Sequence, residues 1–273
     1  MKLGISSYAY PWSCGLTGHM NPPAIDAFAL LARAHAWNLS VVQLCDWPLH
    51  EWPAQDLVRL KARADELGLA IELGTRGIAP AYVKQWIEVA EHLGARHLRT
   101  LLDSKESHPS VDEAVTTLRL VAPRLEEANV CLMIENHDRF TAHSLKHIIE
   151  SIGSACVQVC FDTANSFGCW ERPEEVLAVL GPHIVNVHVK DVRIRRFGHS
   201  SGFVIEGTAA GQGMLDVRGL LKQARAFGRE PNVIVEHWVT EEATVEATLT
   251  KERHMAEDSV RWLTQVLNEM NEV

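Results

Sequence analysis

The sequence predicts an α/β fold, a single (β/α)8 TIM barrel that spans residues 1–273 as one domain. Short β-branched runs alternate eight times with amphipathic, helix-like stretches along the chain. No linker, low-complexity tract or shift in composition divides it. Uninterrupted β-then-α units are typical of a closed parallel sheet with helices outside it, and such barrels commonly have about 250 residues.

An open, doubly wound sheet is the alternative arrangement of the same units. Such a sheet usually binds a dinucleotide through a GxGxxG motif after its first strand. The residues after the first predicted strand read AYPWSCG and lack this motif. The barrel is therefore the preferred prediction, and a dinucleotide site has no support.

The predicted strands are short apolar runs bounded by helix or turn signals. In chain order they cover residues 3–8, 41–46, 70–75, 97–102, 131–136, 157–162, 184–189 and 232–237. The predicted helices between and after them cover residues 23–37, 54–67, 80–93, 110–128, 142–152, 173–180, 216–227 and 251–270. Glycines such as Gly94 and Gly153 follow helix ends, and Ser110 is placed to cap a helix start.

Two connections are long enough to predict a functional role. Residues 192–215 read as an irregular loop rich in glycine and cations between the seventh strand and the seventh helix. Residues 9–22 form the first connection, which also follows a C-terminal strand end. Both loops would lie on the face of a barrel where enzymes of this fold keep their chemistry.

Metal-binding residue types stand at the ends of four consecutive predicted strands. These residues are Glu135, Asp162, His188 and Glu236. Taken singly, each carboxylate is more often a helix cap or a solvated charge, and a lone histidine is more often a hydrogen-bonded structural residue. Together they would place three negative charges in a partly desolvated site, which a divalent cation neutralises.

The composition of this cluster indicates which metal it suits. An oxygen-rich ligand set with one nitrogen favours Mn²⁺, with Mg²⁺, Co²⁺ or Zn²⁺ as alternatives, over a thiolate-type zinc site. The sequence therefore predicts one divalent metal ion as cofactor.

The motifs IENH, FDTAN, NVHVKD and VEHW at these strand ends, with GTAAGQGMLD before the seventh helix, resemble the xylose-isomerase-like barrel superfamily of sugar isomerases and epimerases. The resemblance implies that Glu135, Asp162, His188 and Glu236 are metal ligands. It also implies that Glu135 and Glu236 are the catalytic pair that moves protons.

The sequence departs from some branches of that superfamily. Asn165 stands where ketose 3-epimerases and apurinic endonucleases commonly carry a histidine. The third and fourth strand ends offer Thr75, Arg76 and Asp103 rather than the further histidines of a three-zinc cluster. With the acidic net charge, these departures disfavour a metal-dependent endonuclease of the apurinic type. A non-catalytic sugar-binding barrel is weaker still, because two glutamates that could transfer protons are present.

The ligand set suggests chemistry through a metal-bound enediolate with glutamates as acid and base. The first prediction is an isomerase or epimerase that acts on a small polyhydroxy carbonyl compound, such as a sugar or a sugar acid. The alternative is a lyase on the same scaffold, a decarboxylase or dehydratase of a 3-oxo sugar acid. Asn165 and the cations of residues 192–196 favour the lyase.

Further residues near the strand ends are candidates for substrate binding. Lys190 lies on the strand face of His188, where it either meets an anionic substrate group or pairs with a ligand carboxylate. Arg193 belongs to a cationic run with Arg195, Arg196 and His199, which is otherwise a solvated loop edge.

Other candidates for substrate binding could equally have a purely structural role. His137 and Asn165 follow strand ends, and Trp12 and Trp238 could stack on a sugar ring or simply pack in the core. Arg99 and Gln43 should face inward from earlier strands.

Composition limits the partners. The chain has 26 Lys+Arg and 35 Asp+Glu, a net charge of −9, which disfavours nucleic acid. No apolar run is long enough for a membrane span, and the six cysteines are dispersed. The sequence therefore predicts a cytoplasmic enzyme with reduced thiols and a small, anionic or neutral substrate, and leaves a homo-oligomer open.

Overall fold

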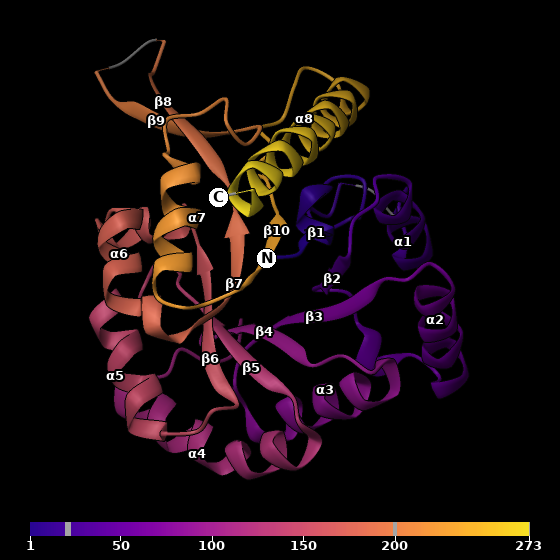
Figure 1. Ribbon diagram of the computed structural model, residues 1–273, viewed down its shortest axis with the longest axis vertical. Coiled ribbons are helices and arrows are strands. Elements are labelled where there is room, and N and C mark those ends of the chain that lie inside the picture. The colour runs from indigo at the N-terminus through magenta and orange to yellow at the C-terminus, as the bar shows by residue number, and fades with distance from the viewer. Residues whose placement is uncertain (20–22, 199–200, 273) are drawn as a thin grey trace.

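The eight barrel strands form one closed parallel sheet (Figure 1) in the order β1-β10-β7-β6-β5-β4-β3-β2. The computed structural model describes residues 1–19, 23–198 and 201–272. The barrel strands are β1 (Leu3–Ser6), β2 (Val41–Cys45), β3 (Ala70–Arg76), β4 (His97–Leu101), β5 (Cys131–Glu135), β6 (Val157–Asp162), β7 (Ile184–Val189) and β10 (Asn232–Val235). The predicted barrel is confirmed.

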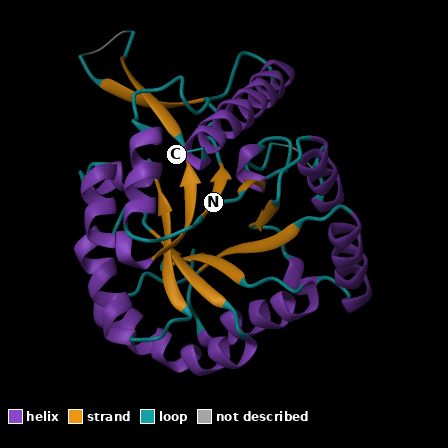
Figure 2. Ribbon diagram, viewed as in Figure 1, coloured by secondary structure: helices purple, strands orange, loops and turns teal. Residues whose placement is uncertain are grey.

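The helices lie around the outside of the strands (Figure 2). They are α1 (Ala27–Ala36), α2 (Ala54–Glu66), α3 (Pro80–Leu93), α4 (Val111–Ala128), α5 (Ala142–Ile152), α6 (Pro173–Leu180), α7 (Val217–Ala226) and α8 (Val245–Asn271). Short 3-10 helices cover Ser7–Ala9, Leu49–Glu51, Asn165–Cys169 and Gly181–His183. Among the described residues, no helix is both long enough and apolar enough to cross a membrane.

Local sequence signals set several helix boundaries. Ser110 caps α4, and Glu113 accepts a hydrogen bond from the Ser110 N–H at 2.7 Å, which completes a capping box. Gly94 and Gly153 end α3 and α5 with φ values of 64° and 68°, a conformation that glycine adopts at little cost.

The connection after β7 is more regular than the sequence predicts. Strands β8 (Asp191–Arg196) and β9 (Phe203–Thr208) pair as an antiparallel hairpin, so the prediction of an irregular loop over residues 192–215 was wrong. Figure 1 shows this hairpin projecting from the barrel. The alternation in VRIRR and FVIE is the signal for it, since Ile194 lies opposite Ile205 across the pair. His199 lies outside the described residues.

Two buried carboxylates hold the loops at the mouth of the barrel. Glu252 of α8 accepts hydrogen bonds from the backbone N–H groups of Trp12 at 2.6 Å and Ser13 at 3.1 Å, which ties down the first connection. Asp191 accepts from the N–H groups of Gly211 and Gly213, each at 2.9 Å. A Cβ on Gly213 would lie 2.0 Å from the Asp191 carboxylate, so this approach requires glycine.

A third buried carboxylate organises the opposite end of the barrel. One oxygen of Glu72 accepts hydrogen bonds from Gln43 at 3.0 Å and Asn186 at 2.7 Å, and the other meets Asn232 at 2.6 Å and His97 at 2.7 Å. Burial by itself would raise the pKa of Glu72, but the hydrogen bonds from His97, Asn232 and Gln43 outweigh it and lower the pKa. The inward-facing Gln43 thus contacts Glu72 at this end.

Replacing Glu72 with glutamine should destabilise the barrel without creating a cavity. The Glu72→Gln side chain keeps one oxygen that accepts hydrogen bonds. Its amide N–H groups, however, would face side chains that now donate to the second carboxylate oxygen, so those hydrogen bonds would be lost. The expected loss in free energy of unfolding is about 1–3 kcal/mol, measured by urea denaturation. Glu66→Gln on the exposed surface of α2 is the matched control and should unfold like the parent.

The same pair of proteins should show a pH-dependent difference. Because the folded-state pKa of Glu72 lies below its usual value of 4.5, its contribution is complete above that pH and is lost as pH falls. The stability gap between the parent and Glu72→Gln should therefore shrink on acidification below about pH 4. A gap that stays constant or widens there would contradict this assignment.

Candidate metal centre

Four side chains converge at the C-terminal end of the barrel. Glu135 and Asp162 end β5 and β6, His188 lies one residue before the end of β7, and Glu236 directly follows β10. One ligand atom from each lies within 4.8 Å of the others, and all four residues are buried. The closed sheet thus brings together the four residues that the sequence suggests as ligands.

The imidazole of His188 lies among the three carboxylates. Its Nδ1 is 3.3 Å from Glu236 Oε2, 3.5 Å from Glu135 Oε2 and 3.9 Å from Asp162 Oδ2. Neither ring nitrogen makes a hydrogen bond among the described residues, although both are buried and Nδ1 faces the three carboxylates. A buried nitrogen without a hydrogen bond is costly, and a metal ion would use its lone pair. The donor set therefore fits a divalent cation.

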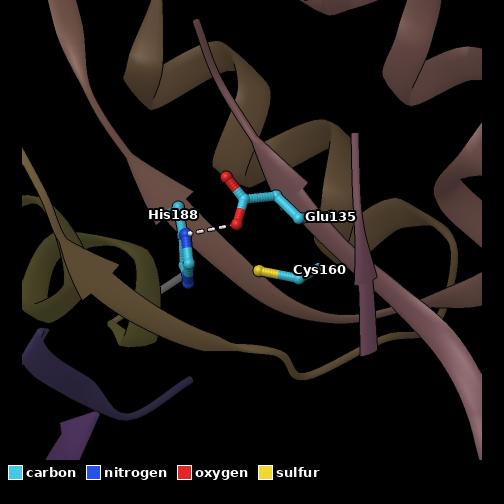
Figure 3. A group of neighbouring side chains, drawn as sticks. All are labelled: Glu135, Cys160 and His188. Carbon is cyan, nitrogen blue, oxygen red and sulfur yellow. Dashed lines mark ion pairs between the residues drawn. The ribbon is translucent and has the colours of Figure 1, made fainter. Parts of the chain in front are cut away.

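A thiol lies beside this group. Figure 3 shows His188 and Glu135 facing each other with Cys160 next to them. Burial raises the pKa of the Cys160 thiol to about 11, so the thiol stays protonated at neutral pH. Because a thiolate is the form that binds metals, the oxygen-rich set with Asp162 and Glu236 is the better candidate.

Two buried cations compensate the carboxylates. Lys190 Nζ pairs with Glu236 Oε2 at 2.7 Å and also with Asp162, while Arg99 pairs with Glu135. Burial alone would raise the pKa of Glu135, but the Arg99 charge beside it holds that pKa well below its usual range. Burial alone would lower the pKa of His188, but the acidic groups around it raise that pKa. The cluster of three carboxylates and two cations is therefore balanced by a protonated His188, and it has one net negative charge when His188 gives up its proton to bind a metal.

Hydrogen bonds orient the individual ligands. Asn165 Nδ2 donates to Glu135 Oε1 at 2.6 Å, and Ser6 Oγ donates to Glu236 Oε1 at 2.8 Å. Asp162 Oδ1 accepts from the backbone N–H of Asn165 at 2.9 Å. Sequence reasoning placed Asn165 near the substrate and missed Ser6, whose only signal is its position at the end of the first strand.

The predicted cationic contacts lie in two different places. Lys190 is buried and takes the ligand-pairing role that the sequence left as its alternative. Arg193 lies on β8, where its Nε is 3.4 Å from Glu206 of β9 and its side chain is 59% exposed. A substrate contact for either residue remains a prediction.

The predicted aromatic contacts are also separated. Trp12 is buried and its indole N–H donates to the Val239 carbonyl at 3.2 Å. Trp238 follows β10 and is 36% exposed. His137 is partly exposed, with Nδ1 3.3 Å from an Asp138 carboxylate oxygen. Their proposed roles in binding remain predictions.

A large cleft opens over the first half of the barrel mouth. Its volume is about 1450 Å³, and its walls include Tyr8, Asp46, Arg76 and Asp103 after the first four strands, with His137 after β5. Sequence reasoning did not assign Tyr8 or Asp46 to a site. The pattern that could have pointed to Tyr8 and Asp46 is a polar side chain just after an otherwise apolar strand.

The profile of the xylose isomerase-like TIM barrel family matches residues 31–266. The chain belongs to this family. It is 32% identical over 265 residues to the 3-oxo-isoapionate decarboxylase of Pectobacterium atrosepticum, covering 96% of this chain and 95% of the relative. The family membership and this relative identify the chain as an enzyme of the xylose isomerase-like TIM barrel family.

Solved structures share the fold at low sequence identity. The D-psicose 3-epimerase with D-tagatose from Clostridium cellulolyticum H10 superposes with a TM-score of 0.75 at 15% identity, over 98% of this chain and 99% of that one. A xylose isomerase-like TIM barrel protein from Mycobacterium smegmatis in complex with magnesium gives 0.67 at 13% identity, over 95% and 97%. At these identities the likeness establishes the fold alone.

The metal assignment predicts a binding defect for His188→Ala. Removing the only nitrogen ligand should weaken Mn²⁺ binding by on the order of tenfold or more, measured by equilibrium dialysis. His143→Ala on the exposed face of α5 is the control and should bind like the parent. Parent-like Mn²⁺ affinity in a folded His188→Ala protein would exclude His188 as a ligand.

Proposed function

We propose that the protein is a divalent-metal-dependent lyase that decarboxylates a 3-oxo sugar acid. The observation that carries the proposal is that both candidate acid/base glutamates are engaged by cations, Glu135 by Arg99 and Glu236 by Lys190. The decarboxylase relative at 32% identity supports the same conclusion. The lyase alternative from the sequence is thus preferred over the isomerase or epimerase.

Ion pairing of the glutamates distinguishes the two reaction classes because only one of them needs a carboxylate that acts as a base. An epimerase needs a base that removes a proton from carbon, and an ion-paired carboxylate with a lowered pKa is a weak base. A 3-oxo acid needs no base to lose carbon dioxide. The C1–C2 bond breaks, its electron pair passes through C2 to the C3 carbonyl oxygen, and a proton then adds at C2.

The residues of the chain have separate tasks in this proposal. A divalent cation held by Glu135, Asp162, His188 and Glu236 would polarise the substrate carbonyl as a Lewis acid. Lys190 pairs with Asp162 and Glu236, and its positive charge favours the charged form of each carboxylate, although burial leaves the pKa of Asp162 raised. Arg99 and Asn165 likewise favour the charged form of Glu135, and Ser6 fixes the orientation of Glu236.

The deciding experiment uses 3-oxo-isoapionate and the Mn²⁺-loaded protein in deuterated water. We expect carbon dioxide release with one solvent-derived deuterium at C2 of the product. A matched incubation with D-tagatose measures carbon–hydrogen exchange without gas release. Exchange on the ketose, with no gas from the 3-oxo acid, would overturn the decarboxylase in favour of an epimerase.

Glu236→Gln should remove turnover while it preserves the fold. The amide keeps the size of the side chain but lacks the charge that pairs with Lys190 and would bind the metal. We expect kcat/KM for carbon dioxide release to fall by about 100-fold or more. Glu241→Gln, an exposed change in the following loop, is the control, and circular dichroism checks the fold of both variants.

A further inference from the structure

Three polar side chains meet at the ends of the first three strands. Tyr8 follows β1, Asp46 follows β2 and Arg76 ends β3. The Tyr8 hydroxyl donates to Asp46 Oδ2 at 2.5 Å and accepts from Arg76 Nη2 at 2.7 Å. Arg76 Nε donates to the same Asp46 oxygen at 2.8 Å. The three groups form a closed hydrogen-bonded triad on the wall of the cleft.

The triad fixes one edge of the Arg76 guanidinium and leaves some of its N–H groups available to a ligand. Nε and Nη2 are used within the triad, and Nη1 has no hydrogen-bond partner among the described residues. The side chain is 44% exposed and lines the cleft. A guanidinium held in place with free N–H groups is suited to a carboxylate, because its planar donors match the two carboxylate oxygens.

The backbone of Asp46 supports a functional reading. Its φ is 57°, in the left-handed region that residues other than glycine adopt at a cost. Such strain concentrates at binding and catalytic sites, where the surrounding structure holds it. Here the held conformation accompanies a carboxylate that contacts both Tyr8 and Arg76.

The other cations near the mouth are less suited to bind a substrate anion. Lys190 and Arg99 are buried and paired with ligand carboxylates. Arg193 pairs with Glu206 on the projecting hairpin. Lys105 lines the same cleft, but no described contact orients its ammonium group. Arg76 is therefore the best-positioned cation for an anion that enters the cleft.

Arg76 is also connected to the metal centre. The carbonyl of its neighbour Thr75 accepts a hydrogen bond from Arg99 Nη1 at 3.1 Å, and the Nε of Arg99 pairs with Glu135. Adding Arg76 and Asp46 to the metal cluster leaves its net charge at one negative when His188 is neutral, because the charges of Arg76 and Asp46 cancel. A divalent cation would make this combined cluster one positive, which complements a monocarboxylate.

We propose that Arg76, positioned by Asp46 and Tyr8, binds the carboxylate of the substrate, while a metal held at the metal centre would bind the carbonyl and hydroxyl oxygens of the same substrate. The inference rests on the proposed function for the identity of that substrate as a sugar acid. Because the contact already exists before carbon dioxide leaves, it contributes to substrate capture more than to the rate of the chemical step.

The test compares an acid with its neutral counterpart and needs no turnover. The probes are 3,4-dihydroxybutanoate and 3,4-dihydroxybutanamide, titrated calorimetrically into the Mn²⁺-loaded protein. Arg76→Met should weaken binding of the acid by about tenfold or more and of the amide by less than about twofold. Arg76→Lys, which keeps the charge but lacks the planar fork, should fall between the parent and Arg76→Met.

Lys105→Met is the matched control because it removes one positive charge from the same cleft. It should change neither affinity by more than about twofold. An equal loss of acid affinity in Lys105→Met and Arg76→Met would overturn the proposal in favour of general electrostatic attraction. Parent-like binding of the acid by Arg76→Met, or equal weakening of acid and amide, would overturn it as well.

The outcome is separable from that of the decarboxylation assay. Selective loss of acid binding in Arg76→Met, with no carbon dioxide from 3-oxo-isoapionate, would retain the carboxylate site and reject the decarboxylase. Carbon dioxide release by the parent together with unchanged acid binding in Arg76→Met would retain the decarboxylase and reject the carboxylate site. Melting temperatures of the variants exclude misfolding as the cause.

Discussion

The concentration of three carboxylates around one buried imidazole is the constraint on which the rest of this molecule depends. Removing Glu135, Asp162 and Glu236 from water without compensation would destabilise the folded chain. Arg99 and Lys190 supply two of the opposite charges, and the incomplete compensation leaves a site that favours a divalent cation. The same charge balance reduces the basicity of the glutamates and so bears on the chemistry.

The barrel makes this concentration possible because it is closed. In a closed parallel sheet all C-terminal strand ends face one mouth, so residues more than 100 positions apart become neighbours. Buried carboxylates outside the metal cluster then stabilise the mouth and the opposite end. Glu252 and Asp191 hold loops by their N–H groups, and Glu72 gathers side-chain donors from four strands.

The mouth is divided between two kinds of polar chemistry. The later strands carry the oxygen and nitrogen donors that suit a metal, whereas the first three carry the triad of Tyr8, Asp46 and Arg76. Arg99 of β4 lies between them and hydrogen-bonds toward both. A 3-oxo acid, in which C2 separates the carboxylate from the C3 carbonyl, offers one group to each kind of chemistry.

The sequence by itself determined the eight β/α units and the four candidate ligands. Those features are readable because strand and helix periodicity and polar strand ends are local signals, as at Glu135 and His188. Only the tertiary structure decided that Lys190 pairs with two carboxylates, that Ser6 orients Glu236, and that residues after β7 form a hairpin. The contacts of Lys190 and Ser6 depend on which side chains from distant strands approach within hydrogen-bond range, and no spacing along the chain encodes that approach. The hairpin has a local signal in the alternation of VRIRR and FVIE, but only the structure shows that the two segments pair.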